Sequence, residues 1–396
     1  MLAFSHSTLS IAASPGVYSD RIVVGGVMDL EGHSRGLGLG MQEGVRAAFK
    51  DVKVQGRRLE FITANDSYTP DLTVKQTQRM IDEGAFVMLG NVGTPTAKVA
   101  LPILAQNKVP AVGFFTGAGL LRPGEGDVVN FRASYIQETA AVISQGIQAG
   151  LEPQEICAYV QNDAYGMAGV EGIRQALRLQ SRSRNLVKTL DQVLEVYGEN
   201  PARNGLGPVG VYERNTLTSR AGYESLKHWE SQQGARCKLV VTVGTYNAIA
   251  RFAAYSRSKG EDWLISAVSF TGADVLGETL EQFGVKDRVI VTQVVPDLHA
   301  NIPLINQARK DLGDRFSYVS LEGYIVGKMF VAMLEKIPGE ITRDAFMQVV
   351  KNSKFDVGGI VLDFQGDNQG SDLVTVTYYK DKKYQAIGPD QWREIL

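Results

Sequence analysis

The sequence predicts an α/β protein of two lobes, each built on a doubly wound parallel β-sheet, with an antiparallel C-terminal β-hairpin. Short apolar runs alternate with longer amphipathic segments along the 396 residues, which is the pattern of repeated β-α-β units. This series restarts after Gly150, so a second sheet is expected to follow the first. Near the end of the chain, strict alternation of apolar and polar residues favours a hairpin instead.

The first series of apolar runs predicts the first lobe. Residues 21–28 (RIVVGGVM) form a continuous apolar run that is typical of a strand buried on both faces. In the next segment, Met41, Val45 and Phe49 recur at the spacing of one helical face. The strands expected in this lobe are 21–28, 58–64, 86–90 and 109–114, and the helices are 40–50, 72–84 and 97–106.

The second series predicts the second lobe and the hairpin. The strands expected are 155–161, 209–212, 239–243, 263–268 and 289–294, and the helices are 168–179 and 246–259. Two further helices, 305–312 and 321–334, are expected to follow this sheet. Alternating strands at 359–364 and 373–379, joined by the Gly- and Asn-containing segment 365–371, form the predicted hairpin. Residues 181–208 contain several Gly and Pro residues and are expected to be a surface insertion.

Composition argues against several classes of function. The net charge of −2 provides no basic field, so a nucleic-acid partner is not expected. No apolar run approaches the roughly 20 residues of a membrane span. The four histidines are scattered and the two cysteines lie near none of them, so neither a metal nor a cofactor is predicted.

The cysteines and the N-terminus each leave two alternatives open. Cys157 and Cys237 lie near the starts of two expected strands, where either a disulfide or two buried thiols fits. Residues 1–20 are expected to be a trimmed export signal or a disordered tail. Small residues at 12–14 resemble a signal-peptide end, but a basic start is missing.

The loops that follow the strands contain the candidate binding residues. In open parallel sheets, ligands bind in the crevice outside the carboxyl ends of the strands. These loops are rich in Gly, Thr, Ser and aromatic residues, which supply N–H groups, hydroxyls and flat walls. Thr94, followed by Pro95, is expected at a helix N-terminus, which favours an anion such as a carboxylate. Ser34, after the first strand, is a further candidate that faces the crevice.

Several of these segments together resemble the type I periplasmic binding proteins of the leucine/isoleucine/valine-binding class. The resemblance covers nearly all of residues 21–396 and rests on the order and spacing of its motifs. Among them are GNVGTPTA (90–97), VPAVGFFTGAG (109–119), QNDAYGMAGVEG (161–172) and SLEGYIVGKMFVAML (320–334).

The resemblance implies two lobes joined by three crossover segments, with a ligand captured between them and no enzymatic chemistry. The N-terminal lobe would comprise residues 21–133 and 296–352, and the C-terminal lobe residues 134–295 and 353–396. It also implies a monomeric periplasmic protein that delivers its small-molecule ligand to an ABC-type membrane permease.

The resemblance further implies roles for particular residues. Two loops of the first lobe would hold a ligand carboxylate, and residues of the second lobe would cover the ligand and line the cleft. The matching positions are Gly93, Thr94, Phe115, Thr116 and Gly117 in the first lobe, and Tyr165, Thr245 and Tyr246 in the second.

One departure from the family concerns the ligand's ammonium group. Amino-acid binders of this class hold that group with an acidic residue, whereas Phe270 falls near this position here. Either Asp163 or Asp274 takes over the role, or the ligand is an aromatic or aliphatic acid without an ammonium group.

Two other kinds of function compete with transport. The same two-lobed module can present a ligand to a receptor or kinase. An enzyme could use the same cleft, because residues 32–36 match the G-x-S-x-G string of hydrolases with Ser34 as the nucleophile. Several residues separate Ser34 from the expected strand and helix, however, which does not fit the sharp strand-to-helix turn of that motif.

Overall fold

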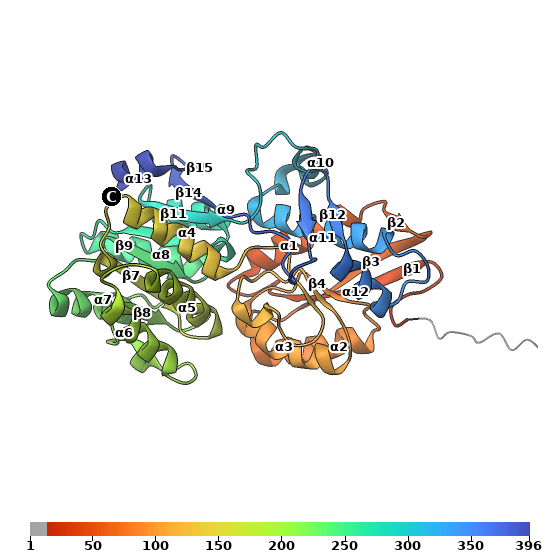
Figure 1. Ribbon diagram of the computed structural model, residues 1–396, viewed down its shortest axis with the longest axis horizontal. Helices are drawn as coiled ribbons and strands as arrows, with labels where there is room; N and C mark the ends of the chain where they lie inside the picture. Colours follow the sequence, from red (N-terminus) through yellow and green to blue (C-terminus); the bar gives the residue numbers. More distant parts are fainter. Residues whose placement is uncertain (1–13) are drawn as a thin grey trace, which may run out of the picture.

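The computed structural model describes residues 14–396, so most of the expected signal remnant or tail lies outside the described residues. The chain forms two α/β lobes side by side (Figure 1). Each lobe has its own central sheet, and a small two-stranded sheet accompanies the first lobe. The two-lobed α/β prediction is therefore confirmed.

The first lobe is built on a six-stranded sheet with the order β2-β3-β1-β4-β5-β6. Its strands are parallel except for β2, and β1 pairs with β3 along its whole length. The strands are β1 (Arg21–Met28), β2 (Lys53–Val54), β3 (Arg57–Asn65), β4 (Met88–Leu89), β5 (Ala111–Val112) and β6 (Val128–Val129). Strands β2 and β6 were not predicted from the sequence, and β4 and β5 are shorter than the strands predicted there.

Helices cover both faces of this sheet. The chain moves one way from β1 to β3 and the opposite way from β3 to β4 and β5, so right-handed crossovers place α1 on one face and α2 and α3 on the other. Helix α11 packs along α1, and α2 packs on α3. The helices are α1 (Arg35–Phe49), α2 (Pro70–Asp82), α3 (Thr94–Gln106), α10 (Pro303–Leu312), α11 (Tyr318–Glu335) and α12 (Arg343–Asn352).

Helix α1 begins at Arg35, five residues before the expected start at residue 40, and its glycines serve helix packing. A Cβ on Gly38 would lie 1.9 Å from the carbonyl oxygen of Asp29, and one on Gly44 would lie 2.1 Å from the carbonyl oxygen of Ser320. Only glycine permits such close backbone approach, so these residues let α1 pack tightly on its neighbours.

The second lobe is built on a seven-stranded sheet with the order β15-β14-β11-β10-β9-β7-β8. The strands β7 to β11 are parallel, and β14 joins β11 in antiparallel orientation. The strands are β7 (Ile156–Gln161), β8 (Val209–Tyr212), β9 (Leu239–Val243), β10 (Leu264–Ala267), β11 (Val289–Gln293), β14 (Thr375–Lys380) and β15 (Lys383–Ala386). The helices are α4 (Tyr135–Gln148), α5 (Ala164–Arg178), α6 (Arg184–Glu195), α7 (Arg220–Gln233), α8 (Tyr246–Ser258), α9 (Ala273–Gln282) and α13 (Pro389–Ile395).

The C-terminal hairpin exists, but its strands differ from those expected. Strand β14 pairs with β15 across a tight turn in which Asp381 and Lys382 both have positive φ. The segment expected to be its first strand is instead β13 (Val361–Asp363), which pairs with β12 (Lys354–Asp356). Gly358 and Gly359, both with positive φ, supply the turn between β12 and β13.

The insertion over residues 181–208 contains a helix that the sequence analysis did not expect. Helix α6 buries Leu186, Leu190 and Val193, and it packs on α5. The spacing of these three side chains is that of one helical face, so the insertion contributes to the core of the second lobe.

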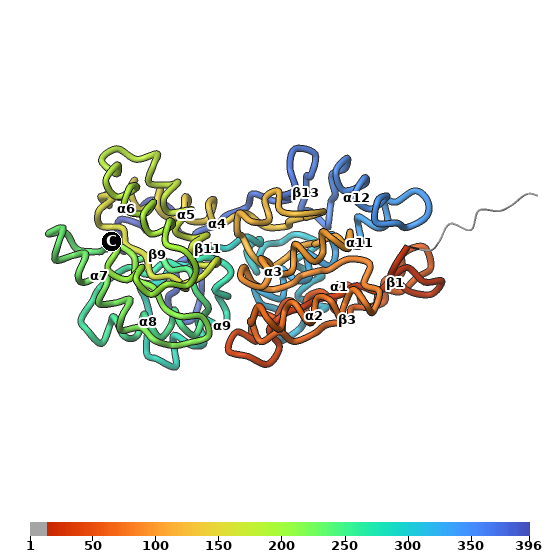
Figure 2. The backbone as a smooth tube through the Cα atoms, turned by 90° about the horizontal axis from the view of Figure 1, so that it is seen from below, coloured from red at the N-terminus to blue at the C-terminus, as the bar shows by residue number. Residues whose placement is uncertain are grey.

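Three segments connect the lobes (Figure 1 and Figure 2). They follow β6, β11 and β13. The first and third run side by side, because the Asn130 N–H donates to the Asn368 carbonyl at 2.7 Å and the Gly370 N–H donates to the Asn130 carbonyl at 2.9 Å. Since β12 and β13 lie beside the helices of the first lobe, the third crossing falls after Gly370 rather than at residue 353.

A disulfide joins Cys157 and Cys237, which settles the alternative that the sequence left open. Cys157 lies in β7 and Cys237 lies just before β9, and these two strands are parallel neighbours. Their Cα atoms are 5.7 Å apart, within the range that a disulfide spans.

Candidate functional site

The candidate site lies where the loops after the strands of the two sheets meet. Hydrogen bonds cross between the lobes at several points of this face. The Gln161 side chain donates to the Tyr68 hydroxyl at 3.1 Å, the Asn247 side chain donates to the His33 carbonyl at 2.7 Å, and the Tyr318 N–H donates to the Asp274 carboxylate at 2.7 Å. The structure is therefore a closed arrangement of the two lobes.

Two threonine hydroxyls form the polar centre of the first lobe's rim. Thr94 is the first residue of α3 and Thr116 follows β5, and their Oγ1 atoms lie 2.6 Å apart in a hydrogen bond. The Tyr135 hydroxyl lies 3.2 Å from the Thr116 hydroxyl. Thr94 and Thr116 are both completely buried. Adjacent sheet strands thus bring together the two threonines that the sequence analysis selected.

Two predicted glycines leave room for aromatic rings beside this pair. Gly93 has φ of +112°, and a Cβ there would lie 2.4 Å from the ring of Tyr68. A Cβ on Gly117 would lie 2.7 Å from the ring of Tyr135. Any larger residue would displace these rings, so both glycines act through the packing of their neighbours.

Five aromatic side chains from both lobes pack on one another next to the threonines, and we call them the aromatic cluster. They are Tyr68 and Phe115 from the first lobe, Tyr135 at the start of α4, and Tyr165 and Phe270 from the second lobe. The ring of Phe270 lies at the centre, with its centroid 4.7 Å from that of Tyr165, 5.2 Å from that of Phe115 and 6.3 Å from that of Tyr68. Burial raises the pKa of Tyr135 to about 12, so its hydroxyl is a neutral hydrogen-bonding group at pH 7.

Little open space remains beside the aromatic cluster. The cavity beside Phe115, Ser269 and Glu322 measures only about 10 Å³, about the volume that one water molecule needs. A molecule the size of an amino acid enters this region only if Phe270 and Tyr165 withdraw with their lobe.

A buried charged network lies next to the aromatic cluster. Arg132, in the first crossover segment, pairs with Glu138 of α4 at 3.4 Å and with Glu322 of α11 at 3.5 Å. Its guanidinium carbon lies 4.9 Å from the centre of the Phe115 ring. Because burial outweighs the attraction of Arg132, the pKa of Glu322 rises to about 7. Arg132 therefore bridges acidic residues of both lobes.

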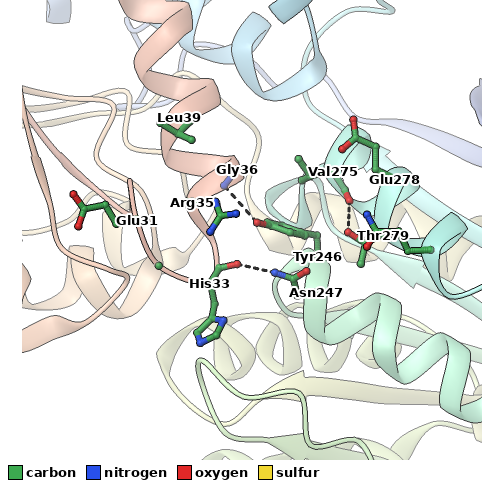
Figure 3. Close-up of a pocket in the computed structure, with 12 residues that line it drawn as sticks. Glu31, His33, Arg35, Gly36, Leu39, Tyr246, Asn247, Val275, Glu278 and Thr279 are labelled. Atoms are coloured by element: carbon green, nitrogen blue, oxygen red, sulfur yellow. Dashed lines mark hydrogen bonds between the residues drawn. The ribbon is translucent and has the colours of Figure 1, made fainter.

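A larger cavity of about 490 Å³ opens at the edge of the interlobe face (Figure 3). Residues after β1 line one side, including Glu31, His33 and Arg35, and residues of α8 and α9 line the other. The predicted site residue Tyr246 lines this cavity, and its hydroxyl accepts a hydrogen bond from the Gly36 N–H at 3.4 Å. This cavity is lined mostly by polar residues and shares none of them with the aromatic cluster.

Ser34 and Thr245 are not members of the aromatic cluster, although Thr245 follows Gly244, whose carbonyl accepts a hydrogen bond from the Tyr165 hydroxyl at 3.3 Å. The Ser34 N–H donates to the Asp29 carboxylate at 2.8 Å, and within residues 14–396 its buried hydroxyl has no hydrogen-bond partner. The Thr245 N–H donates to the Tyr212 hydroxyl at 3.1 Å.

Neither predicted acidic residue has a free carboxylate. The Asp163 carboxylate accepts hydrogen bonds from the Tyr165 N–H at 2.9 Å, from Gln161 at 2.8 Å and from Arg214 at 2.9 Å. The Asp274 carboxylate faces the N-terminus of α11 through the Tyr318 N–H. Burial raises the pKa of Asp274 to about 6.

The sequence analysis missed Tyr68, Arg132 and Tyr135. Tyr68 follows β3, so it too lies in a loop at the carboxyl end of a parallel strand, where the other candidate residues were sought. Arg132 and Tyr135 lie between β6 and α4, and because β6 has only two residues, no apolar run indicated a strand there.

No helix within residues 14–396 is long and apolar enough to cross a membrane.

Comparison with known proteins identifies the family. Residues 21–182 match the periplasmic binding protein family. No curated protein shows significant sequence similarity to the chain. Among solved structures, a possible leucine/isoleucine/valine-binding protein from Rhodopirellula baltica is 33% identical, with a TM-score of 0.83, and the match covers 97% of this chain and 100% of that one.

Two more distant structures share the fold with bound molecules. They are an R. palustris ABC-transporter solute-binding protein in complex with 4-hydroxybenzoate and a Thermus thermophilus branched-chain amino acid ABC transporter protein with bound valine. Each is 16% identical with a TM-score of 0.71, and each match covers 93% of this chain and 96% of the other. With its two lobes, its order of strands and its relative from R. baltica, the chain belongs to the type I periplasmic binding proteins, the solute-binding proteins of ABC transporters.

Proposed function

We propose that this protein is a monomeric periplasmic receptor that captures a small carboxylate-bearing molecule between its lobes and delivers it to an ABC-type permease. The observation that carries the proposal is the Thr94–Thr116 hydroxyl pair at the N-terminus of α3. It lies beside Tyr135 and Phe115, on which Tyr165 and Phe270 of the opposite lobe pack. The disulfide agrees with an oxidising compartment such as the periplasm.

The threonine pair suits a carboxylate for two reasons. The first turn of α3 presents free N–H groups, and the helix dipole favours a negative charge there. The two hydroxyls, which bond each other in the closed structure, would each donate to a carboxylate oxygen once the ligand is present. Such charge-assisted hydrogen bonds contribute roughly 1.5–3 kcal/mol each.

The surroundings favour an acid without an ammonium group. Phe270 occupies the centre of the aromatic cluster, where an acidic side chain would be needed for a cation. The carboxylates of Asp163 and Asp274 already accept hydrogen bonds, from Arg214 and from the Tyr318 N–H respectively. An aromatic or aliphatic body would pack against the rings that now contact one another, so we propose an aromatic or aliphatic acid rather than an amino acid.

Binding then requires the lobes to open and close again. A ligand that contacts both lobes binds the closed state more tightly than the open state. Binding therefore shifts the population toward the closed state.

The double variant Thr94→Ala/Thr116→Ala tests this function. Mass spectrometry of molecules released from the purified protein and thermal-shift screening with 4-hydroxybenzoate, octanoate and L-valine first identify a bound probe. Calorimetry with that probe should then show affinity reduced at least about 100-fold in the double variant, the equivalent of about 3 kcal/mol. Thr77→Ala is the control, because Thr77 is an equally buried threonine of α2. Equal affinity in the double variant and the control would reject the carboxylate assignment, and preference for L-valine would reject the ammonium-free ligand.

A further inference from the structure

We infer that the 181–208 insertion positions the cleft residues Asp163 and Tyr165 and holds the lobes closed. It does so through hydrogen bonds that run from Glu199 to Tyr68 of the opposite lobe, and through Arg203, which anchors the insertion on Asn162. This inference rests on the opening and closing of the lobes in the proposed function. It gives the insertion a role in binding although none of its residues belongs to the threonine pair or the aromatic cluster.

Arg203 fastens the insertion to the end of β7. Its side chain is 2% exposed, and its guanidinium donates to the carbonyls of Val193, Val196 and Gly198 within the insertion. It also donates to the Asn162 side chain at 2.8 Å. Since Asn162 precedes Asp163, this arginine ties the fold of the insertion directly to the cleft loop.

Glu199 provides the second connection. Its carboxylate lies 3.0 Å from the Arg214 guanidinium, and the same Arg214 nitrogen lies 2.9 Å from the Asp163 carboxylate. Arg214 is thus held between an acidic residue of the insertion and an acidic residue of the cleft. Asp163 in turn caps α5 by accepting the Tyr165 N–H, which sets the position of a ring in the aromatic cluster.

Gln161 extends the chain of contacts across the lobes. Its amide nitrogen donates to the Asp163 carboxylate at 2.8 Å and to the Tyr68 hydroxyl at 3.1 Å. On the first lobe, Tyr68 is held in a left-handed conformation with φ of +53°, and its N–H donates to the Asp66 carboxylate at 2.9 Å. The Tyr68 hydroxyl is therefore a rigidly held acceptor. It faces the Gln161 amide, whose orientation depends on its hydrogen bond to Asp163.

The experiment measures closure without any ligand. Lys50→Cys on the first lobe and Lys259→Cys on the second introduce labelling sites for a fluorescent donor and acceptor. Both lysines are exposed, and the native cysteines are paired in the disulfide and buried. Single-molecule energy transfer then gives the ratio of closed to open molecules in the background of Glu199→Gln, Tyr68→Phe and the double variant.

We expect each single variant to lower the closed-to-open ratio about 2- to 5-fold, and the double variant to behave like Tyr68→Phe alone. Glu195→Gln is the matched control, because Glu195 is an exposed acidic residue of the same insertion and forms no ion pair within residues 14–396. Unchanged urea unfolding of Glu199→Gln shows that the lobe itself remains folded.

Two results would overturn the inference and separate it from the proposed function. Additive effects of Glu199→Gln and Tyr68→Phe, or equal effects of Glu199→Gln and Glu195→Gln, would overturn the role of the insertion and leave the two-lobed receptor intact. A single energy-transfer state in every variant would show that the lobes do not move, and both proposals would fail.

Discussion

Replacing Phe270 with alanine should open the lobes as well as weaken the fold. The Phe270 ring contacts Tyr165 within its own lobe and both Phe115 and Tyr68 across the cleft. Opening separates it from the latter two, so their interaction energy is present only in the closed state. At about 0.5–1.5 kcal/mol for each aromatic pair, the closed state loses about 1–3 kcal/mol relative to the open one. This corresponds to a shift of about 5- to 150-fold toward open molecules.

Interlobe energy transfer in the absence of ligand measures this shift, and small-angle X-ray scattering should show a larger radius of gyration. Phe252→Ala is the control. Phe252 is equally buried, but its ring stacks on Tyr159 at 3.7 Å and on Trp263 at 6.1 Å within the second lobe alone.

Both variants should lose about 3–5 kcal/mol of unfolding free energy, the usual cost of deleting a buried phenylalanine ring. Only Phe270→Ala should change the closed-to-open ratio. If the two variants opened to the same extent, or if Phe270→Ala stayed closed, the view that the aromatic cluster holds the lobes together would be wrong.

Two further predictions concern stability. The double variant Cys157→Ala/Cys237→Ala should lose up to about 4.5 kcal/mol of unfolding free energy in urea, because the disulfide closes a loop with a sequence separation of 80; a loss below about 1 kcal/mol would contradict the loop-entropy argument. The pKa of Glu322 is about 7 in the fold and near 4.5 in the unfolded chain, so its contribution to stability is fully present below about pH 4.5 and is lost as the pH rises through about 7. Glu322→Gln should therefore flatten the curve of unfolding free energy against pH between about pH 4.5 and 7. An unchanged curve would show that the pKa of Glu322 is not raised in the fold.

The sequence predicted the elements whose signal is local. Strand β1 and strand β9 have the expected bounds, because continuous apolar runs mark strands that are buried on both faces. The threonine pair was also predictable, since neighbouring parallel strands bring their following loops to one edge of the sheet.

The errors arose where the decisive contacts are distant in sequence. The start of α1 was predicted five residues too late. Within this helix, Gly40 and Gly44 permit a close approach to α11, which lies far along the chain and leaves no local signal in the sequence around residue 35. The wrong hairpin partner of 359–364 arose because the turn of the true hairpin, Asp381-Lys382, has positive φ without glycine. The contact between aromatic side chains of the two lobes could not be predicted from local sequence patterns either. It depends on side chains that come from loops of both sheets.

The paired backbone of the first and third connections limits how the lobes move. Hydrogen bonds between Asn130 and residues 368–370 join these two connections where they leave the first lobe. We therefore expect the two connections to bend together when the lobes open and close. A shared hinge would bring the lobes to a similar closed orientation with different molecules, so a membrane partner could recognise the closed outline of the receptor rather than the bound molecule.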